Sequence, residues 1–414
     1  MNKIKSLIRL PLLLTLSATA TANSDHQWVG QVNGVANYND AAATWLDGGL
    51  GRFGVDSDDG DSVGLLGEVQ LGYNYRLNDQ FSIRTHLQVQ ETTEDSSARS
   101  VGVVELKARY VIAPEWDQKF TFTAGQFFLP ISLENTNRFW ESPYTINFSS
   151  LNSWIGEEFR PIGVDASYKK TFESGNQWSL ATTIFGGNDS MGAILAWRGW
   201  SHGRHRSVFG DTLSLPELDS LNTGGPFEDQ RDDGSKPFGR DLDDRPGYAI
   251  RTAWQTEDYL FNLSWVDNLG DTELHHGEYA WRTKFAILGA SWFVTDEFEL
   301  LAEGTSGSTT MGAGPGVDVN FYSAYIMASY LVNELRYSAR LEKFAAHDKD
   351  AVDDENNDSG RSYTLAIMWE PEESNVSGGA ELLYVDSKRI RMTSNGTFED
   401  QESISISLLA KYAF

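Results

Sequence analysis

The last eleven residues of the chain alternate strictly between two kinds of side chain. Counted back from the end, one face is apolar or aromatic throughout: Phe414, Tyr412, Ala410, Leu408, Ile406 and Ile404. The other face is mostly polar or small: Ala413, Lys411, Leu409, Ser407 and Ser405. A period of two is typical of a β-strand, whose side chains point alternately to opposite faces. The segment therefore predicts a strand with one apolar and one largely hydrated face.

The first 22 residues have the three parts of a secretory signal peptide. A basic start is followed by a short apolar core and a small-x-small cleavage site, carried by Lys3, Lys5 and Arg9, by residues 10–16, and by Ala20-Thr21-Ala22. The apolar core is too short to cross a bilayer as a helix. We expect residues 1–22 to be removed and the mature chain to begin at Asn23. Losing three cations takes the formal charge from −26 to −29.

The composition of the exported part favours a closed β-barrel in a membrane. The sequence has no cysteine, so no disulfide framework holds it together. Aromatic residues make up 12% of the chain, glycine occurs 38 times, and no long apolar run follows the signal. In hydrocarbon a closed sheet gives every backbone amide a partner while its strands keep alternating in polarity. The alternative for this composition is a large soluble periplasmic or secreted β-protein.

Sixteen alternating segments follow one another along the chain. They are 28–38, 64–76, 80–92, 100–112, 118–128, 159–171, 177–187, 246–256, 259–267, 279–293, 297–306, 318–331, 335–344, 361–370, 375–388 and 402–414. Short turns alternate with long connections near 39–63, 93–99, 129–158, 188–245, 268–278, 307–317, 345–360 and 389–401. That order predicts an all-β fold, a transmembrane antiparallel β-barrel of about 16 strands with short periplasmic turns and long extracellular loops. Segment 190–200 could form a further short strand.

The charges fall into two groups by position. The loops near 39–63 and 345–360 are rich in acids, whereas the predicted lumen faces carry more bases than acids. The bases are Arg76, Arg84, Lys107, Arg109, Lys169, Arg251, Arg282, Lys284, Arg336, Arg340 and Lys411; the acids are Glu68, Glu105, Asp165, Glu299, Glu303, Glu342 and Glu381. Charges in a narrow lumen act on a passing ion more strongly than loop charges screened by salt. The pattern predicts an anion preference, unless the lumen charges pair and cancel.

Two connections have unusual compositions. Segment 127–160 mixes aromatic and charged residues and is too apolar for a solvated loop, which predicts an inward fold that narrows the pore or packing against a neighbouring subunit or over the rim. Segment 198–206 holds three arginines and two histidines, suited either to an oxyanion or to ion pairs with acids of its own loop. The candidate pore-lining and binding residues are Arg84, Lys107, Arg109, Arg138, Arg160, Arg251, Arg282, Lys284, Arg336, Arg340, Arg198, Arg204 and Arg206.

The chain resembles the porin O and P family, the phosphate-selective type of Gram-negative outer-membrane porins. The resemblance rests on the signal peptide, the strand number, the stretch Gly125-Gln126-Phe127-Phe128-Leu129-Pro130, the return at Arg160-Pro161-Ile162-Gly163-Val164, and the final Phe414. A terminal aromatic of this kind resembles the sorting signal of outer-membrane barrels. The resemblance implies a homotrimer in the outer membrane, in contact with lipopolysaccharide and inserted by the barrel assembly machinery. The chain departs from the family at 268–278, where lysines are absent and Asp271, Glu273, His275 and His276 stand.

Other kinds of function have weaker support. The sequence contains neither a Gly-x-Ser-x-Gly elbow nor a His-Glu-x-x-His metal motif, and its acidic runs lack the EF-hand spacing. We therefore predict no catalytic residues, no metal, no cofactor and no nucleic-acid partner. The predicted function is passive diffusion of small hydrophilic solutes or inorganic anions, phosphate among them. A sugar- or cation-preferring channel and an outer-membrane enzyme are the alternatives.

Overall fold

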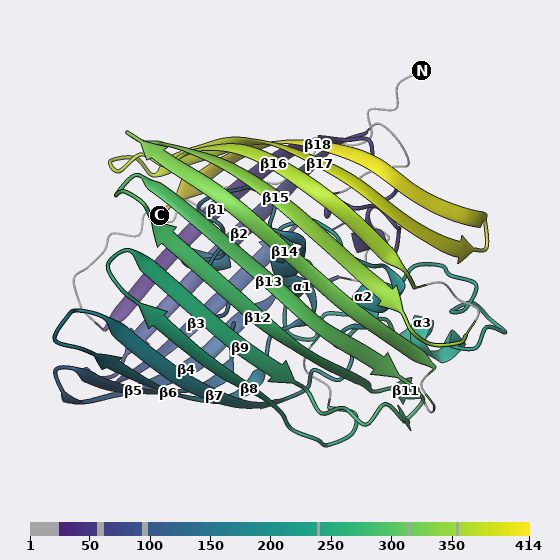
Figure 1. Ribbon diagram of the computed structural model, residues 1–414, viewed down its shortest axis with the longest axis horizontal. Coiled ribbons are helices and arrows are strands. Elements are labelled where there is room, and N and C mark those ends of the chain that lie inside the picture. Colours follow the sequence, from purple (N-terminus) through teal and green to yellow (C-terminus); the bar gives the residue numbers. More distant parts are fainter. Residues whose placement is uncertain are drawn as a thin grey trace.

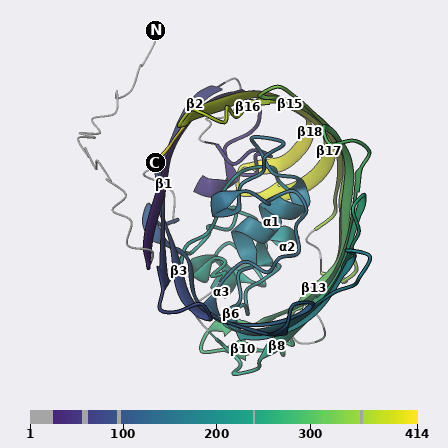
Figure 2. The ribbon, with the colours of Figure 1, turned by 90° about the vertical axis from the view of Figure 1, so that its left-hand side faces the viewer.

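The computed structural model describes residues 25–55, 62–92, 98–237, 241–312, 314, 316–352 and 356–414. In these residues sixteen antiparallel strands close into one barrel (Figures 1 and 2). The predicted fold class is therefore confirmed. Among the described residues no helix is long and apolar enough to cross a membrane. The predicted signal peptide, residues 1–22, lies outside the described ranges.

The barrel strands follow chain order around the wall. They are β1 (His26–Asn39), β2 (Ser62–Arg76), β3 (Phe81–Gln90), β4 (Val101–Glu115), β5 (Gln118–Gln126), β6 (Ile162–Thr171), β7 (Gln177–Gly186), β8 (Gly247–Gln255), β9 (Tyr259–Asp267), β12 (Trp281–Phe293), β13 (Phe298–Met311), β14 (Val317–Val332), β15 (Leu335–Asp348), β16 (Asp358–Trp369), β17 (Val376–Thr393) and β18 (Gly396–Ala413). The last strand closes the ring on the first, from the pair Gln31 and Ala413 to the pair Asn39 and Ser405. Phe414 continues this pairing, since its N–H donates to the carbonyl of Gly30 at 2.9 Å.

Short elements lie in the connections. These are the 3-10 helices η1 (Trp45–Asp47) and η2 (Arg138–Trp140), the α-helices α1 (Ser150–Glu158), α2 (Ala193–Trp197) and α3 (Glu228–Asp233), and the two-residue strands β10 (Leu274–His275) and β11 (Glu278–Tyr279). We name four long connections loop 1 (residues 40–61), loop 2 (91–100), loop 3 (127–161) and loop 4 (187–246). They leave the same end of the barrel, here called the long-loop end.

Two sequence predictions about connections are wrong. The predicted loop at 389–401 is instead a continuation of the hairpin, because β17 runs to Thr393 and β18 begins at Gly396. Gly396 has a φ of +112°, a conformation that favours glycine, so the chain can reverse within two residues. The possible strand at 190–200 is the short helix α2, which lies inside the ring of strands (Figure 2).

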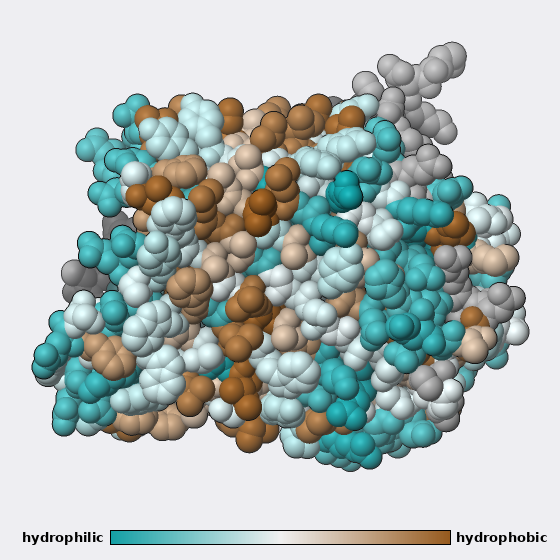
Figure 3. Space-filling model, viewed as in Figure 1, coloured by the Kyte–Doolittle hydropathy of each residue, from teal (hydrophilic) through white to brown (hydrophobic). Residues whose placement is uncertain are grey.

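The outer surface carries an apolar band with aromatic residues near the short-turn end. Exposed Leu, Ile and Val side chains point outward in the middle of the strands, among them Leu263, Leu288, Ile326 and Leu365. Aromatic side chains form paired rows closer to the short turns, as where Trp178 pairs with Trp254 and Tyr330 with Tyr337. In Figure 3 the brown and pale band contrasts with the teal long-loop end on the right. Such a band and girdle match a barrel surrounded by lipid.

The interior is divided into a packed half and a polar half. Near the long-loop end the inward side chains are large and apolar, and they form one buried cluster with loops 3 and 4: Trp281, Phe285, Phe321, Phe344, Trp154 and Trp200 are examples. Figure 2 shows α1 and α2 lying within the barrel, where these residues meet. Toward the short-turn end the inward residues are polar and partly exposed, such as Asn74, Arg84 and Arg109. Because these side chains are partly exposed, solvent reaches the second half of the interior.

Candidate pore and its charged walls

One side of the polar half carries a row of cations from five successive strands. The basic row consists of Arg76 on β2, Arg84 on β3, Arg109 on β4, Lys119 on β5 and Lys169 on β6. All five alternate with outward apolar residues such as Leu106 and Phe122, so they point into the barrel. Within the described residues none of the five forms an ion pair. Their positive charges therefore face the lumen without being neutralised.

The sequence prediction missed one member of this row. Lys119 lies directly opposite Lys169 in the β5–β6 register. Phe120, Phe122 and Ala124 occupy the outward positions of β5, and this alternation is the signal that places Lys119 inside.

The opposite wall carries acids, and loop 3 is bound to them. Glu303 accepts the Leu133 N–H at 2.6 Å, Glu342 accepts the Ser150 N–H at 2.6 Å, and Glu381 accepts the Ile146 N–H at 2.6 Å. Glu299 accepts the Tyr144 hydroxyl at 2.9 Å. We call these four residues of β13, β15 and β17 the glutamate wall. Hydrogen bonds to a carboxylate are stronger than neutral ones, so this wall fixes the path of loop 3.

Four further predicted lumen cations point inward but are neutralised. Lys107 lies 2.7 Å from Glu105, Arg251 pairs with Asp165, Arg340 pairs with Glu134, and Lys411 lies 2.9 Å from Glu141. Arg336 also points inward, where it donates to Ser329 at 2.9 Å and lies over the Tyr144 ring. The predicted alternative of paired lumen charges thus holds for these four residues and not for the basic row.

The prediction of a lumen position is wrong for Arg282 and Lys284. On β12 the buried inward positions are Trp281, Thr283 and Phe285, and the two bases lie on the exposed outward face. Arg282 contacts Asp267 at 3.2 Å on that face. This part of β12 lies in the packed half, where the interior is apolar and the outer surface beyond the lipid-facing band is polar. The apolar residues of β12 therefore point inward and its two bases point outward.

The arginine-rich segment of loop 4 lies inside the barrel and pairs with acids from other elements. Arg198 contacts Glu157 of loop 3 at 2.6 Å. Arg204 lies 3.0 Å from both Glu68 of β2 and Glu141 of loop 3. Arg206 also pairs with Glu68. The predicted ion-paired knot is therefore present, but its carboxylates come from loop 3 and the barrel wall, not from the arginines' own loop.

The remaining predicted cations belong to loop 3. Arg138 in η2 is exposed. Arg160 is fully buried, donates to the carbonyls of Ser207 and Gly156, and lies 3.7 Å above the Phe128 ring. Burial lowers the pKa of Arg160 to about 9. Arg160 thus joins loop 3 to loop 4 and does not face a solute.

The packed loops shift the titration of several groups. Burial alone raises the pKa of Glu141, but Lys411 and Arg204 more than offset it and hold that pKa at about 2. Burial, with Arg206 and Arg160 nearby, lowers the pKa of His205 to about 3. Glu141 is therefore a permanent anion at neutral pH and His205 is neutral.

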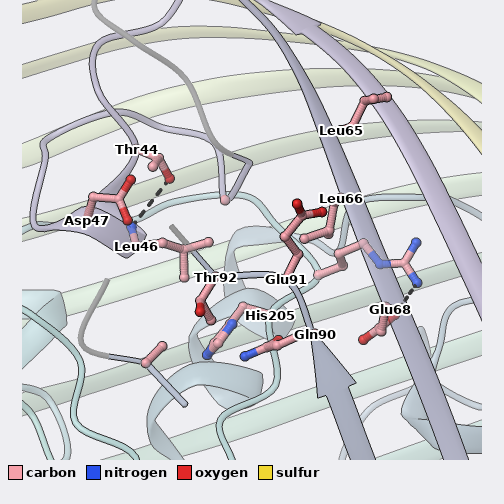
Figure 4. Close-up of a pocket in the computed structure, with 13 residues that line it drawn as sticks. Thr44, Leu46, Asp47, Leu65, Leu66, Glu68, Gln90, Glu91, Thr92 and His205 are labelled. Carbon is pink, nitrogen blue, oxygen red and sulfur yellow. Dashed lines mark hydrogen bonds and ion pairs between the residues drawn. The ribbon is translucent and has the colours of Figure 1, made fainter. Parts of the chain in front are cut away.

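A small pocket lies at the long-loop end, beside the ion pairs that Arg204 forms with Glu68 and Glu141. It has a volume of about 120 Å³ and is lined by loop 1, β2, β3, loop 2 and loop 4. Figure 4 shows His205 and Gln90 between Asp47 on one side and Glu68 on the other. Glu68 and Arg204, which are bonded to each other, also line the pocket, and Arg204 contacts Glu141 as well.

One buried trio has the residue types of a hydrolase. Nε2 of His202 lies 3.2 Å from Glu342 and 3.1 Å from the Ser362 hydroxyl. A relay needs the acid and the nucleophile on different ring nitrogens. Here both contact Nε2, and within the described residues Nδ1 has no partner. All three side chains are buried, so the trio lacks both the relay geometry and access for a substrate.

One acidic trio could hold a cation. Carboxylate oxygens of Asp189, Asp241 and Asp243 come within 4.8 Å of one another in loop 4. Burial, followed by the neighbouring Asp243 and Asp241, raises the pKa of Asp189 to about 7. Three oxygens fall short of the six to eight that calcium takes. The acid runs at 56–61 and 353–355 lie outside the described residues.

This geometry defines an outer-membrane β-barrel that crosses the membrane with sixteen strands. No protein-family model and no curated protein matches the sequence. Among solved structures the chain is similar to the anion-selective porin from Comamonas acidovorans, with a TM-score of 0.53 and 12% identity over 94% of this chain and 99% of that one. It is also similar to OmpT of Vibrio cholerae, with a TM-score of 0.50 and 9% identity over 94% and 97% of the chains. At these identities the likeness establishes the fold.

Proposed function

We propose that the protein is a porin that passes small hydrophilic solutes by passive diffusion and prefers anions. The observation that carries the proposal is the basic row, whose five cations face the lumen without ion pairs, while the glutamate wall opposite is covered by loop 3. Fixed charges between low-dielectric walls select the permeant ion. The net charge of −26 is then a poor guide to selectivity, because loop acids are screened within about 8–10 Å.

The proposed orientation places the short turns in the periplasm and the long loops outside. The aromatic girdle near the short turns and the lengths of loops 3 and 4 support it. We also propose a homotrimer, since the solved structure of in-vitro folded OmpT is described as a trimer form. Insertion by the barrel assembly machinery and contact with lipopolysaccharide stay predictions.

The path in this proposal is narrow. Its inner part is the polar half of the barrel, and its outer part is the pocket that ends at Glu68 and Arg204. In this proposal the ion pairs of Arg204 with Glu68 and Glu141 separate the two parts. Such a constriction favours small ions over sugars. Phosphate is a candidate solute because the chain resembles the porin O and P family. The two stretches that carry this resemblance contain Gly125 and Gly163, which pair directly across β5 and β6. A Cβ on either glycine would lie 2.1 Å from a backbone carbonyl, so both positions require glycine.

An enzyme is the weaker proposal. Its best candidate trio, His202, Glu342 and Ser362, is buried and lacks the relay geometry described above. In a channel these contacts would hold loop 4 to the barrel wall, because His202 belongs to loop 4 and Glu342 and Ser362 belong to wall strands.

The reversal potential across a planar bilayer under a potassium chloride gradient tests the proposal. The wild type is expected to give the sign of an anion-preferring pore. Arg84→Glu with Arg109→Glu reverses two charges of the basic row and is expected to move the potential toward cations. Lys388→Glu on the outward face of β17 is the control and is expected to leave it unchanged. A cation-preferring wild type, or equal shifts in both variants, would contradict the proposal.

A further inference from the structure

The pocket beside Arg204 has the size of one small organic molecule. Its volume is about 120 Å³. A water molecule in a cavity needs about 10–15 Å³, so the pocket has room for roughly ten non-hydrogen atoms. A branched-chain amino acid fits within this limit, whereas a disaccharide or a tripeptide exceeds it. The pocket is therefore suited to a single amino acid or a molecule of similar size.

One part of the lining belongs to a group of ion pairs that keeps a net positive charge. Glu68 pairs with Arg204 and Arg206, and Glu141 pairs with Arg204 and Lys411, so three cations share two carboxylates. Nη2 of Arg204 makes both of its hydrogen bonds to these carboxylates. Nε of the same buried guanidinium has no partner within the described residues. Because a buried donor without an acceptor is costly, Arg204 is suited to a carboxylate ligand.

The same pocket is also lined by two acids outside those ion pairs. They are Asp47 of loop 1 and Glu91 of loop 2. Glu91 is exposed and forms no ion pair among the described residues. Figure 4 shows it above His205, between Asp47 and Glu68. Opposite charges around one cavity of this size are complementary to an α-amino acid, whose ammonium and carboxylate groups are attached to the same carbon.

The remaining walls suit a short apolar side chain. Loop 1, β2 and loop 2 supply the apolar members of the lining, which are Leu46, Leu65, Leu66 and Ala98. Small-molecule pockets combine such walls with a few placed polar groups that fix the orientation of the ligand. A charged ligand side chain would lose its hydration against these residues without a partner. An aliphatic side chain is therefore favoured.

We propose that this pocket binds a small zwitterionic α-amino acid with an aliphatic side chain, such as leucine. Its carboxylate contacts Arg204, its ammonium group contacts Glu91 and Asp47, and its side chain lies against Leu46 and Leu66. The proposal rests on the channel function proposed above in that it names a solute held at the long-loop end of the path. Binding itself requires neither a conducting pore nor an ion preference.

Isothermal titration calorimetry of the purified protein in detergent tests the proposal with leucine as the probe. Two analogues each lack one charge of leucine: 4-methylpentanoate has no ammonium group, and 3-methylbutylamine has no carboxylate. Leucine is expected to bind at least about tenfold more tightly than either analogue, because only leucine satisfies both kinds of lining group. Equal affinities would overturn the proposal. Tighter binding of either analogue would also overturn it, since it would indicate a simple ion site.

Two variants separate loss of charge from loss of space. Glu91→Gln keeps the shape of an exposed side chain and is expected to weaken leucine binding by about tenfold while binding of 4-methylpentanoate stays the same or improves. Thr92→Phe fills the pocket without changing its charges and is expected to weaken leucine and both analogues alike. Heat-modifiable migration on a gel checks that each barrel is intact.

Glu273→Gln is the matched control, because Glu273 is an exposed acid of the connection 268–278 and does not line the pocket. It is expected to bind leucine as the wild type does. Undiminished leucine binding by both folded pocket variants would overturn the proposal. Since calorimetry does not depend on conduction, a bilayer recording that contradicts the anion preference would leave the binding result intact.

Discussion

Lys119 and Lys169 lie directly opposite each other on β5 and β6, both pointing into the barrel. Like charges at opposed positions destabilise a strand pair, and within the described residues neither lysine has a carboxylate partner. Arg109 is close enough to Lys119 for their charges to repel as well. The pair therefore concentrates positive potential in the polar half of the lumen, at a cost to the stability of the strand pair.

Neutralising this pair should change selectivity without weakening the barrel. Lys119→Gln with Lys169→Gln removes two repelling charges, so the thermal unfolding temperature is expected to stay the same or rise. The anion-to-cation permeability ratio is expected to fall by about twofold or more, because two of the five cations of the basic row are lost. Bilayer recordings measure the ratio. A neutralised outward pair, Arg282→Gln with Lys284→Gln, should leave it unchanged, and an equal fall there would contradict the basic row as the source.

The alternation of polar and apolar residues was enough to predict the barrel. All sixteen predicted strands are present, and the segment 259–267 has the observed bounds of β9. The terminal segment at 404–414 pairs with β1 in the structure. Period-two patterning predicts strands well because it reflects local geometry, the opposite directions of successive side chains.

The same rule failed where the surroundings of the wall change along a strand. In the polar half a polar side chain points inward, whereas in the packed half Phe285 points inward and Lys284 outward. A sequence does not mark where loops fill the lumen, so the inward face was assigned by polarity and Lys284 was misplaced. The ion pairs of Arg204 with Glu68 and Glu141 were also beyond prediction, because they join elements 136 and 63 residues apart.

Glu381 should control how tightly loop 3 is held. Its carboxylate accepts the N–H groups of Ile146 and Asn147 and the Asn147 side-chain amide. Glu381→Ala leaves three buried donors without their acceptor, at about 1–3 kcal/mol each. We expect loop 3 to loosen, which would raise the noise of the open channel and expose the loop to protease. Glu299→Ala is the matched control, because Glu299 meets loop 3 only through the Tyr144 hydroxyl. A larger effect in that control would contradict Glu381 as the main anchor of loop 3 within the glutamate wall.

Asp211 should make the stability of loop 4 depend on pH. Asp211 is buried, and burial raises its pKa to about 6 although it accepts the N–H groups of Arg99 and Val208. His205 lies 3.9 Å away, and Arg99 and Arg160 also face it. Because the folded form binds the Asp211 proton more tightly than the unfolded form, the stability that Asp211 contributes is fully present below pH about 4 and is lost as the pH rises through about 6. The loss is at most about 3 kcal/mol for a shift of this size.

Hydrogen exchange of the amides of loops 2 and 4, corrected for intrinsic rates, measures that dependence. His205 and Asp189 of loop 4 titrate in the wild type and in Asp211→Asn alike, so the test is the difference between the two profiles. The free energy of local opening of the wild type, minus that of Asp211→Asn, is expected to fall between pH 4.5 and pH 6.5 and then to level off. A difference that rises with pH would mean that the Asp211 carboxylate is stabilised in the fold, contrary to its burial.

Arg204 should act as the tie that closes the inner side of the 120 Å³ pocket. Its guanidinium lies 3.0 Å from both Glu68 and Glu141, and its side chain is only 5% exposed. Arg204→Ala breaks a buried pair, which costs about 3–5 kcal/mol locally, and removes the side chain between the pocket and the polar half. We expect single-channel conductance to rise and selectivity to move toward cations, since the two carboxylates lose a shared partner.

Arg138→Ala removes an exposed cation of loop 3 and is the control for a change of charge alone. Arg204→Lys should be intermediate, because one ammonium cannot bridge both carboxylates as the guanidinium does. If conductance in Arg204→Ala equals that of the wild type, the ion pairs of Arg204 lie off the conducting path and the pocket is not its entrance.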